Sequence, residues 1–135
     1  MLATQVTKEN LHKMVVQFYT KVIKDEVVGS FFIEKLGSDL QSEKWVAHLE
    51  TLTDFWAAVP LQDFTYKGNP FAPHAQIQGI SAQAFQRWLE LFSQTLDAIY
   101  VEEIANSFKN RSQVIAGNFM RNLGLNNQYL RTPIQ

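Results

Sequence analysis

The sequence predicts an all-α fold. Apolar residues recur at three- and four-residue spacing along four long segments, and residues that favour helix ends stand at their boundaries. The only strand-like alternation, at 64–66, is too short to build a sheet. A chain of 135 residues fits one domain. We therefore expect a single domain over residues 1–124, followed by a polar and loose tail over 125–135.

The first helix is predicted to begin after Thr7, whose hydroxyl can cap it, and to run to about Lys24. Its inward positions are apolar and follow helical spacing: Leu11, Met14, Val15, Phe18 and Val22. Gly29 and Ser30 then interrupt the helical pattern.

Three further helices follow. Ser42 can cap a helix that ends at Pro60, with the apolar stripe Trp45, Leu49, Leu52, Trp56 and Val59. Ser81 can cap the next, whose stripe is Phe85, Trp88, Leu89, Phe92, Leu96 and Ile99. The last runs from about Glu102 to Leu123, where Gly124 ends it.

Composition excludes several classes of protein. Lys and Arg number 12 and Asp and Glu 13, a net charge of −1, so the basic surface that nucleic acids require is absent. The longest apolar run is about seven residues, far below the ~18 that span a bilayer. With no Cys, the chain has no disulfide, zinc finger or thiol nucleophile. The first seven residues lack the features of a signal peptide, so we expect a cytoplasmic protein.

Aromatic residues make up 13% of the chain, which indicates a very aromatic core or a large flat group to pack. Of the three histidines, His48 falls on the inward side of its helix, where it is either a core histidine bonded to a carbonyl or a residue that faces a ligand. His74 follows a stretch with two prolines and is either a loop histidine or a metal ligand. His12 lies off the apolar stripe and is expected on the surface.

Tyr19 and Trp88 are inward residues that each carry a hydrogen-bond donor. Taken singly, each is more often a core residue than a site residue. Together with His48 and His74, they form a set that could sandwich a planar iron cofactor. Arg111 also lies on an apolar stripe, where it either extends to solvent or meets a carboxylate.

In this order the sequence resembles the truncated haemoglobins, and specifically their third group. The resemblance extends from about Leu11 to Leu123 and rests on five blocks: FYTKV at 18–22, GSFF at 29–32, WVAH at 45–48 with FWA at 55–57, YKGNPFAPH at 66–74, and FQRWLELF at 85–92. The Gly-Gly pairs typical of the first two groups are missing, as expected for the third.

The resemblance implies a 2-on-2 globin fold in the predicted domain and a haem b cofactor (iron protoporphyrin IX). His74 matches the family's proximal ligand of the haem iron. Tyr19, His48 and Trp88 match its distal residues, which face the bound ligand. Phe32 and Leu52 are expected to contact the haem.

The implied function is binding of dioxygen, nitric oxide and carbon monoxide, with dioxygen held tightly by hydrogen bonds. The alternative is a haem redox enzyme of the same fold, a nitric-oxide dioxygenase or a peroxidase-like enzyme, with a reductase as a candidate partner. The residues leave open whether His48 ligates the iron and which of Lys44, Lys67, Arg87 and Arg111 hold the haem propionates. A cofactor-free helical interaction module, with both histidines in the core, is the third hypothesis.

Overall fold

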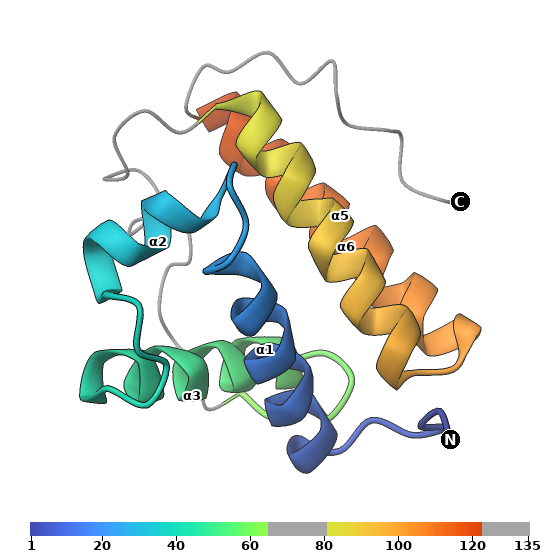
Figure 1. Ribbon diagram of the computed structural model, residues 1–135. Coiled ribbons are helices and arrows are strands. Elements are labelled where there is room, and N and C mark those ends of the chain that lie inside the picture. Colours follow the sequence, from blue (N-terminus) through green and yellow to red (C-terminus); the bar gives the residue numbers. More distant parts are fainter. Residues whose placement is uncertain (65–80, 123–135) are drawn as a thin grey trace.

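The computed structural model describes residues 1–64 and 81–122, and these residues form five helices. The helices are α1 (Lys8–Val22), α2 (Gly29–Leu36), α3 (Glu43–Ala57), α5 (Ala82–Ile99) and α6 (Glu102–Asn122) (Figure 1). Within the described ranges there is no β-strand, and one isolated bridge pairs Ala3 with Tyr100. The predicted all-α class is confirmed.

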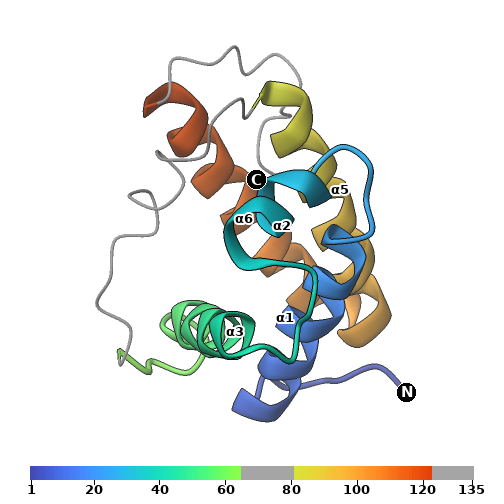
Figure 2. The same cartoon turned by 60° about the vertical axis from the view of Figure 1, so that its left-hand side comes forward.

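The helices pack around α1. Helices α5 and α6 run side by side, and α1 lies between α5 on one side and α3 on the other (Figures 1 and 2). The face of α1 toward these neighbours carries the fully buried residues Leu11, Met14, Val15, Phe18 and Val22. This is the apolar stripe that the sequence predicts.

Each predicted N-cap in the described ranges is confirmed. The hydroxyls of Thr7, Ser42 and Ser81 accept hydrogen bonds from backbone N–H groups in the first turns of α1, α3 and α5, at 3.0, 3.3 and 3.2 Å. In α1 the side-chain oxygen of Asn10 accepts a hydrogen bond from the backbone N–H of Thr7, which completes a capping box. The helices end earlier than predicted, α1 at Val22 and α3 at Ala57.

Helix α2 was not predicted, because its start carries no cap signal. Its N-cap is Val28, which has no capping side chain. The Asp25 carboxylate, further back in the chain, instead accepts hydrogen bonds from the N–H groups of Val27 and Val28, at 2.9 and 3.2 Å. Gly29 lets this turn close, since a Cβ there would lie 2.9 Å from the carbonyl oxygens of Val22 and Ile23.

The far end of α2 is fastened to α3. Gly37 follows α2 with a φ of 82°, in the region that favours glycine. The indole N–H of Trp45, in the first turn of α3, donates to the Gly37 carbonyl at 2.7 Å. Trp45 is fully buried, so the contact fixes α2 against α3 inside the core.

The start of the chain is held by the corner between α5 and α6. Ala3 donates to the Ile99 carbonyl at 2.8 Å and accepts from Val101 at 3.0 Å. The Tyr100 hydroxyl donates to the Asn10 side chain at 2.7 Å, and burial raises the pKa of Tyr100. Among the described residues, no helix is long and apolar enough to cross a membrane.

Candidate functional site

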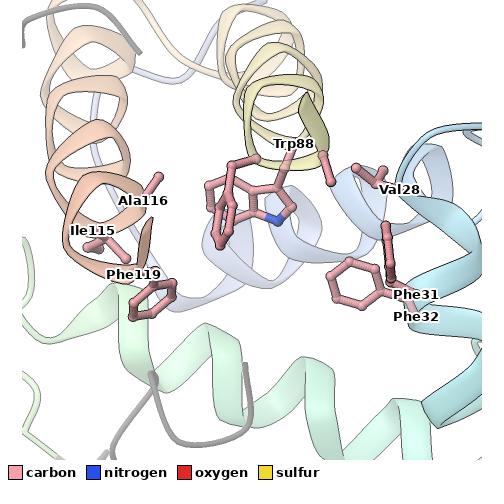
Figure 3. Close-up of a pocket in the computed structure, with 9 residues that line it drawn as sticks. Val28, Phe31, Phe32, Trp88, Ile115, Ala116 and Phe119 are labelled. Atoms are coloured by element: carbon pink, nitrogen blue, oxygen red, sulfur yellow. The ribbon is translucent and has the colours of Figure 1, made fainter. Parts of the chain in front are cut away.

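An apolar hollow lies between α2, α5 and α6, with a volume of about 430 Å³ including the solvent at its mouth. Its lining comes from three places in the chain: Val28, Phe31 and Phe32; Ala84, Phe85 and Trp88; and Ile115, Ala116 and Phe119. Figure 3 shows α2 residues on one side, α6 residues on the other, and Trp88 of α5 between them. We call this space the aromatic hollow.

Two predicted site residues, Phe32 and Trp88, line the aromatic hollow directly. Tyr19 lies behind them on α1 and is 4% exposed. Its ring centre is 5.3 Å from that of Phe32, and its oxygen shares a hydrogen bond with the Trp88 side chain. Burial raises the pKa of Tyr19 well above its ordinary value, and the Trp88 hydrogen bond only partly opposes this. The phenol is therefore neutral at physiological pH.

His48 joins this group through Tyr19. The imidazole of His48 lies on α3 with its ring centre 5.8 Å from that of Tyr19, in an edge-on arrangement. Its Nε2 atom is buried. The structure thus brings Tyr19, His48 and Trp88, which are far apart in the sequence, into one connected cluster.

Trp45 is a supporting residue that the sequence reasoning did not assign to the site. Its ring lies 5.6 Å from both Tyr19 and His48, and it stacks on Phe32 at 6.3 Å. Because its N–H is engaged with Gly37, Trp45 holds these rings in position without offering a donor to the hollow. Its position three residues before His48, on the same helix face, was the available signal.

The orientation of Trp88 is fixed by aromatic neighbours. Its indole stacks on Phe92 at 5.4 Å and meets Phe18 edge-on at 5.2 Å. These contacts fix the plane of the indole beside Tyr19. The neighbouring Arg87 pairs with Asp25 at 2.7 Å and with Glu90 at 3.0 Å, which ties α5 to the turn before α2.

The other expected residues lie apart from this cluster or outside the described residues. Leu52 lies one turn after His48 on α3, partly buried against the main core, and is not in the described lining of the aromatic hollow. His74, the expected iron ligand, lies outside the described residues, as do Lys67 and the 125–135 tail. His12 is exposed, as predicted.

The basic residues considered for the haem propionates have different surroundings in the structure. Arg87 is already paired with two carboxylates. Lys44 is exposed in the first turn of α3. Arg111 lies over the rings of Trp56 and Phe108, at 5.4 and 5.3 Å, and meets no carboxylate of the described residues.

Several lining residues were not predicted as part of the site. Phe85 was placed on an apolar stripe, but periodicity does not distinguish a residue that packs in a core from one that lines a hollow. Ile115 and Phe119 lie one turn apart on α6, at helical spacing. The Phe31 side chain lies on α2, the helix that the sequence did not reveal.

Comparison with known proteins agrees with this geometry. No protein-family model matches the chain. The group 3 truncated hemoglobin ctb of Campylobacter jejuni is 32% identical over 118 residues, which cover 87% of this chain and 91% of that protein. The crystal structure of a group III truncated hemoglobin from Campylobacter jejuni superposes with a TM-score of 0.84 at 32% identity, covering 91% of this chain and 95% of the other.

The helical packing is that of a globin. The fold is therefore more than a generic helical bundle. Within the globins, the chain belongs to the group 3 truncated haemoglobins.

Proposed function

We propose that this globin binds haem b in the aromatic hollow and holds dioxygen and other diatomic ligands there by hydrogen bonds. The observation that carries the proposal is that Tyr19 and His48 cluster with Trp88, which lines the apolar hollow. Family membership supports haem as the cofactor. The proposal keeps His74 as the proximal ligand, on the strength of the sequence resemblance.

The residues present fit a haem. A porphyrin is flat and largely apolar, and the hollow is walled by the flat side chains of Phe31, Phe32, Phe85, Trp88 and Phe119. The polar side chains that stand beside it are a phenol, an imidazole and an indole, each of which can donate a hydrogen bond. When bound, the iron supplies a coordination position for a diatomic ligand.

Tyr19 is the residue best placed to donate to that ligand. A tyrosine oxygen that accepts a hydrogen bond from Trp88 still has one proton to donate. Its raised pKa keeps this proton on the oxygen throughout the physiological range. Because Tyr19 is buried, water does not compete well for the proton.

The expected consequence is slow ligand release. If Tyr19 and one further donor each contribute about 1–1.5 kcal/mol net, together they slow dissociation by about a hundredfold. Slow release favours ligand storage, sensing or reaction in place over rapid transport.

The second candidate is a redox enzyme on the same site. Tyr19 and Trp88, two side chains that can be oxidised, are hydrogen-bonded to each other beside the hollow. Stopped-flow mixing of the oxygenated protein with nitric oxide separates the two functions. Rapid oxidation with stoichiometric nitrate indicates a dioxygenase, whereas slow oxidation without nitrate contradicts it. If the enzyme function holds, a reductase is the partner that would return the iron to its ferrous form.

Absorption spectra test the proposed function. Purified protein supplied with hemin is expected to give a Soret band that shifts when the reduced form meets carbon monoxide. His74→Ala is expected to weaken or abolish haem binding, and His12→Ala, an exposed control, to leave it unchanged. Failure of the wild-type protein to bind haem stoichiometrically would contradict the proposal and favour a cofactor-free module. A His48→Ala spectrum shows whether that imidazole occupies the sixth position.

A further inference from the structure

A second hollow lies between the end of α3 and the middle of α6. It is open to solvent, with a volume of about 830 Å³ including the solvent at its mouth. Phe55, Ala58 and Val59 line it from the end of α3 and the turn that follows, and Arg111, Val114 and Ile115 line it from α6. We call it the α3–α6 hollow. Apart from Arg111 and its neighbour Asn110, the described lining is apolar.

Arg111 gives the α3–α6 hollow its one positive charge among the described lining residues. Its guanidinium lies over the rings of Trp56 and Phe108, which hold it in place from the core side. Burial lowers the pKa of Arg111 but leaves the group protonated at physiological pH. The cation is thus fixed at the edge of the hollow.

Among the described residues, Arg111 differs from three other cations in having no ion-pair partner. Lys8, Arg87 and Lys109 each form an ion pair with an aspartate, at 2.5, 2.7 and 2.8 Å. Arg111 forms none with any carboxylate of the described residues. A partly desolvated guanidinium without an anion favours binding of one, and its planar donors match a carboxylate through two parallel hydrogen bonds.

The walls indicate that the anion carries an apolar group. Val59 and Val114 are 65% and 49% exposed at the rim, and Phe55 and Ile115 are partly buried further in. A ligand that covers these side chains gains about 25 cal/mol for each Å² of apolar surface that it removes from water. A small inorganic anion would cover none of them.

We propose that the α3–α6 hollow binds an amphipathic monocarboxylate of the fatty-acid type. Its carboxylate pairs with Arg111, and its chain lies along Val114 and Val59 toward Phe55 and Ile115. Ile115 also lines the aromatic hollow, so the end of the chain meets the wall that the two spaces share. The site uses no residue of the Tyr19, His48 and Trp88 cluster, and of its described lining residues it shares Ile115 alone with the aromatic hollow.

Isothermal titration with sodium decanoate tests this site, on the full chain both with and without added hemin. We expect one decanoate per chain in both forms. Arg111→Gln is expected to weaken binding about tenfold or more, as loss of a charge-assisted bidentate pair should. Lys109→Gln is the matched control, because it removes a cation from the same helix that is already paired with Asp97. It is expected to bind decanoate as the wild type does.

Two comparison ligands and one further variant complete the test. Decanol keeps the chain without the charge and acetate keeps the charge without the chain, and each is expected to bind at least about tenfold more weakly than decanoate. Val114→Asp leaves Arg111 in place but supplies it with a carboxylate one turn away, and is expected to abolish binding. The proposal is overturned if wild-type protein does not bind decanoate, if decanol or acetate binds equally well, or if Arg111→Gln and Val114→Asp both leave the affinity unchanged.

Discussion

At the scale of single residues, the site depends on one buried phenol. Tyr19 is 4% exposed, lies edge-on to Phe32 and His48, and shares a hydrogen bond with Trp88. Buried polar groups without partners are costly, so Trp88 stabilises the phenol in this position. The same hydrogen bond leaves the tyrosine proton available to a ligand in the aromatic hollow.

Tyr19→Phe is expected to speed dioxygen dissociation about tenfold, because it removes one hydrogen bond of about 1–1.5 kcal/mol. Tyr100→Phe is the control, since it removes another buried phenol hydroxyl that bonds to Asn10, away from the hollow. Stopped-flow replacement of dioxygen by carbon monoxide measures both rates. Equal rates in wild type and Tyr19→Phe would exclude Tyr19 as a ligand donor.

The raised pKa of Tyr19 gives a pH prediction. The folded-state pKa lies above the ordinary value of ~10, so the phenol stays protonated throughout the range from about pH 6 to 9. Dioxygen dissociation is therefore expected to show no step from ionisation of Tyr19 in this range. A step near neutral pH that disappears in Tyr19→Phe would contradict the described burial.

At the scale of elements, three of the four helices that the sequence reveals have a capping residue next to their first turn. Thr7, Ser42 and Ser81 cap α1, α3 and α5 with side chains next to the helix, so local sequence was sufficient. Helix α2 starts without such a residue. Asp25 instead accepts hydrogen bonds from the N–H groups of Val27 and Val28, just before the helix. Asp25 is itself held by Arg87, 62 residues away in the sequence. A contact so distant in sequence is not visible in local pattern.

Asp25→Asn is expected to lower the free energy of unfolding by about 1.5–3 kcal/mol at neutral pH, the range for hydrogen bonds to a charged group. The Asp25 side chain is 8% exposed. Burial raises the pKa of Asp25, but the hydrogen bonds from Arg87 and the backbone lower it by more, so the pKa lies below its ordinary value. Asp97→Asn breaks the Lys109 pair, whose aspartate is 57% exposed, and is the control with little expected effect.

The sign of the Asp25 shift sets the pH range of this effect. Because the folded-state pKa is lowered, the stabilisation is fully present above the unfolded value of ~3.9 and is lost as pH falls through the folded-state value. Denaturant titrations of wild type and Asp25→Asn should differ by a constant amount from about pH 5 to 8 and converge in acid. A difference that grows in acid would contradict the assignment.

Gly29→Ala is expected to destabilise the protein by about 1–3 kcal/mol, because the new Cβ would lie 2.9 Å from two backbone carbonyl oxygens. Ser30→Ala, next to it and exposed, is the control with little expected change. Thermal unfolding followed by circular dichroism compares them. Equal stability in the two variants would show that the α1–α2 turn tolerates a side chain.

At the scale of the whole molecule, periodicity predicted which helix faces meet but not where they leave space. The stripes predicted for α1, α3 and α5 are buried or partly buried with one exception, since Val59 lies after the end of α3 and is 65% exposed. Phe92 is 1% exposed in the core, while Phe85 and Trp88 on the same helix line the aromatic hollow. That difference depends on how α2 and α6 cover α5, which no single segment encodes. The sequence pattern suggested Tyr19, His48 and Trp88 as one set, but their distal role was implied only by the family resemblance, because the three residues come from three different helices.

Filling the aromatic hollow tests the central claim most directly. Ala116→Phe places a ring from α6 in the hollow, whereas Ala98→Phe places one on the exposed side of α5. Hemin titration is expected to show at least about tenfold weaker binding for Ala116→Phe, with helix content unchanged by circular dichroism, and wild-type affinity for Ala98→Phe. Ala84→Leu, a smaller filling from α5, should weaken binding in the same direction. Wild-type affinity and stoichiometry in both filled variants would contradict the account, because the haem would then bind elsewhere.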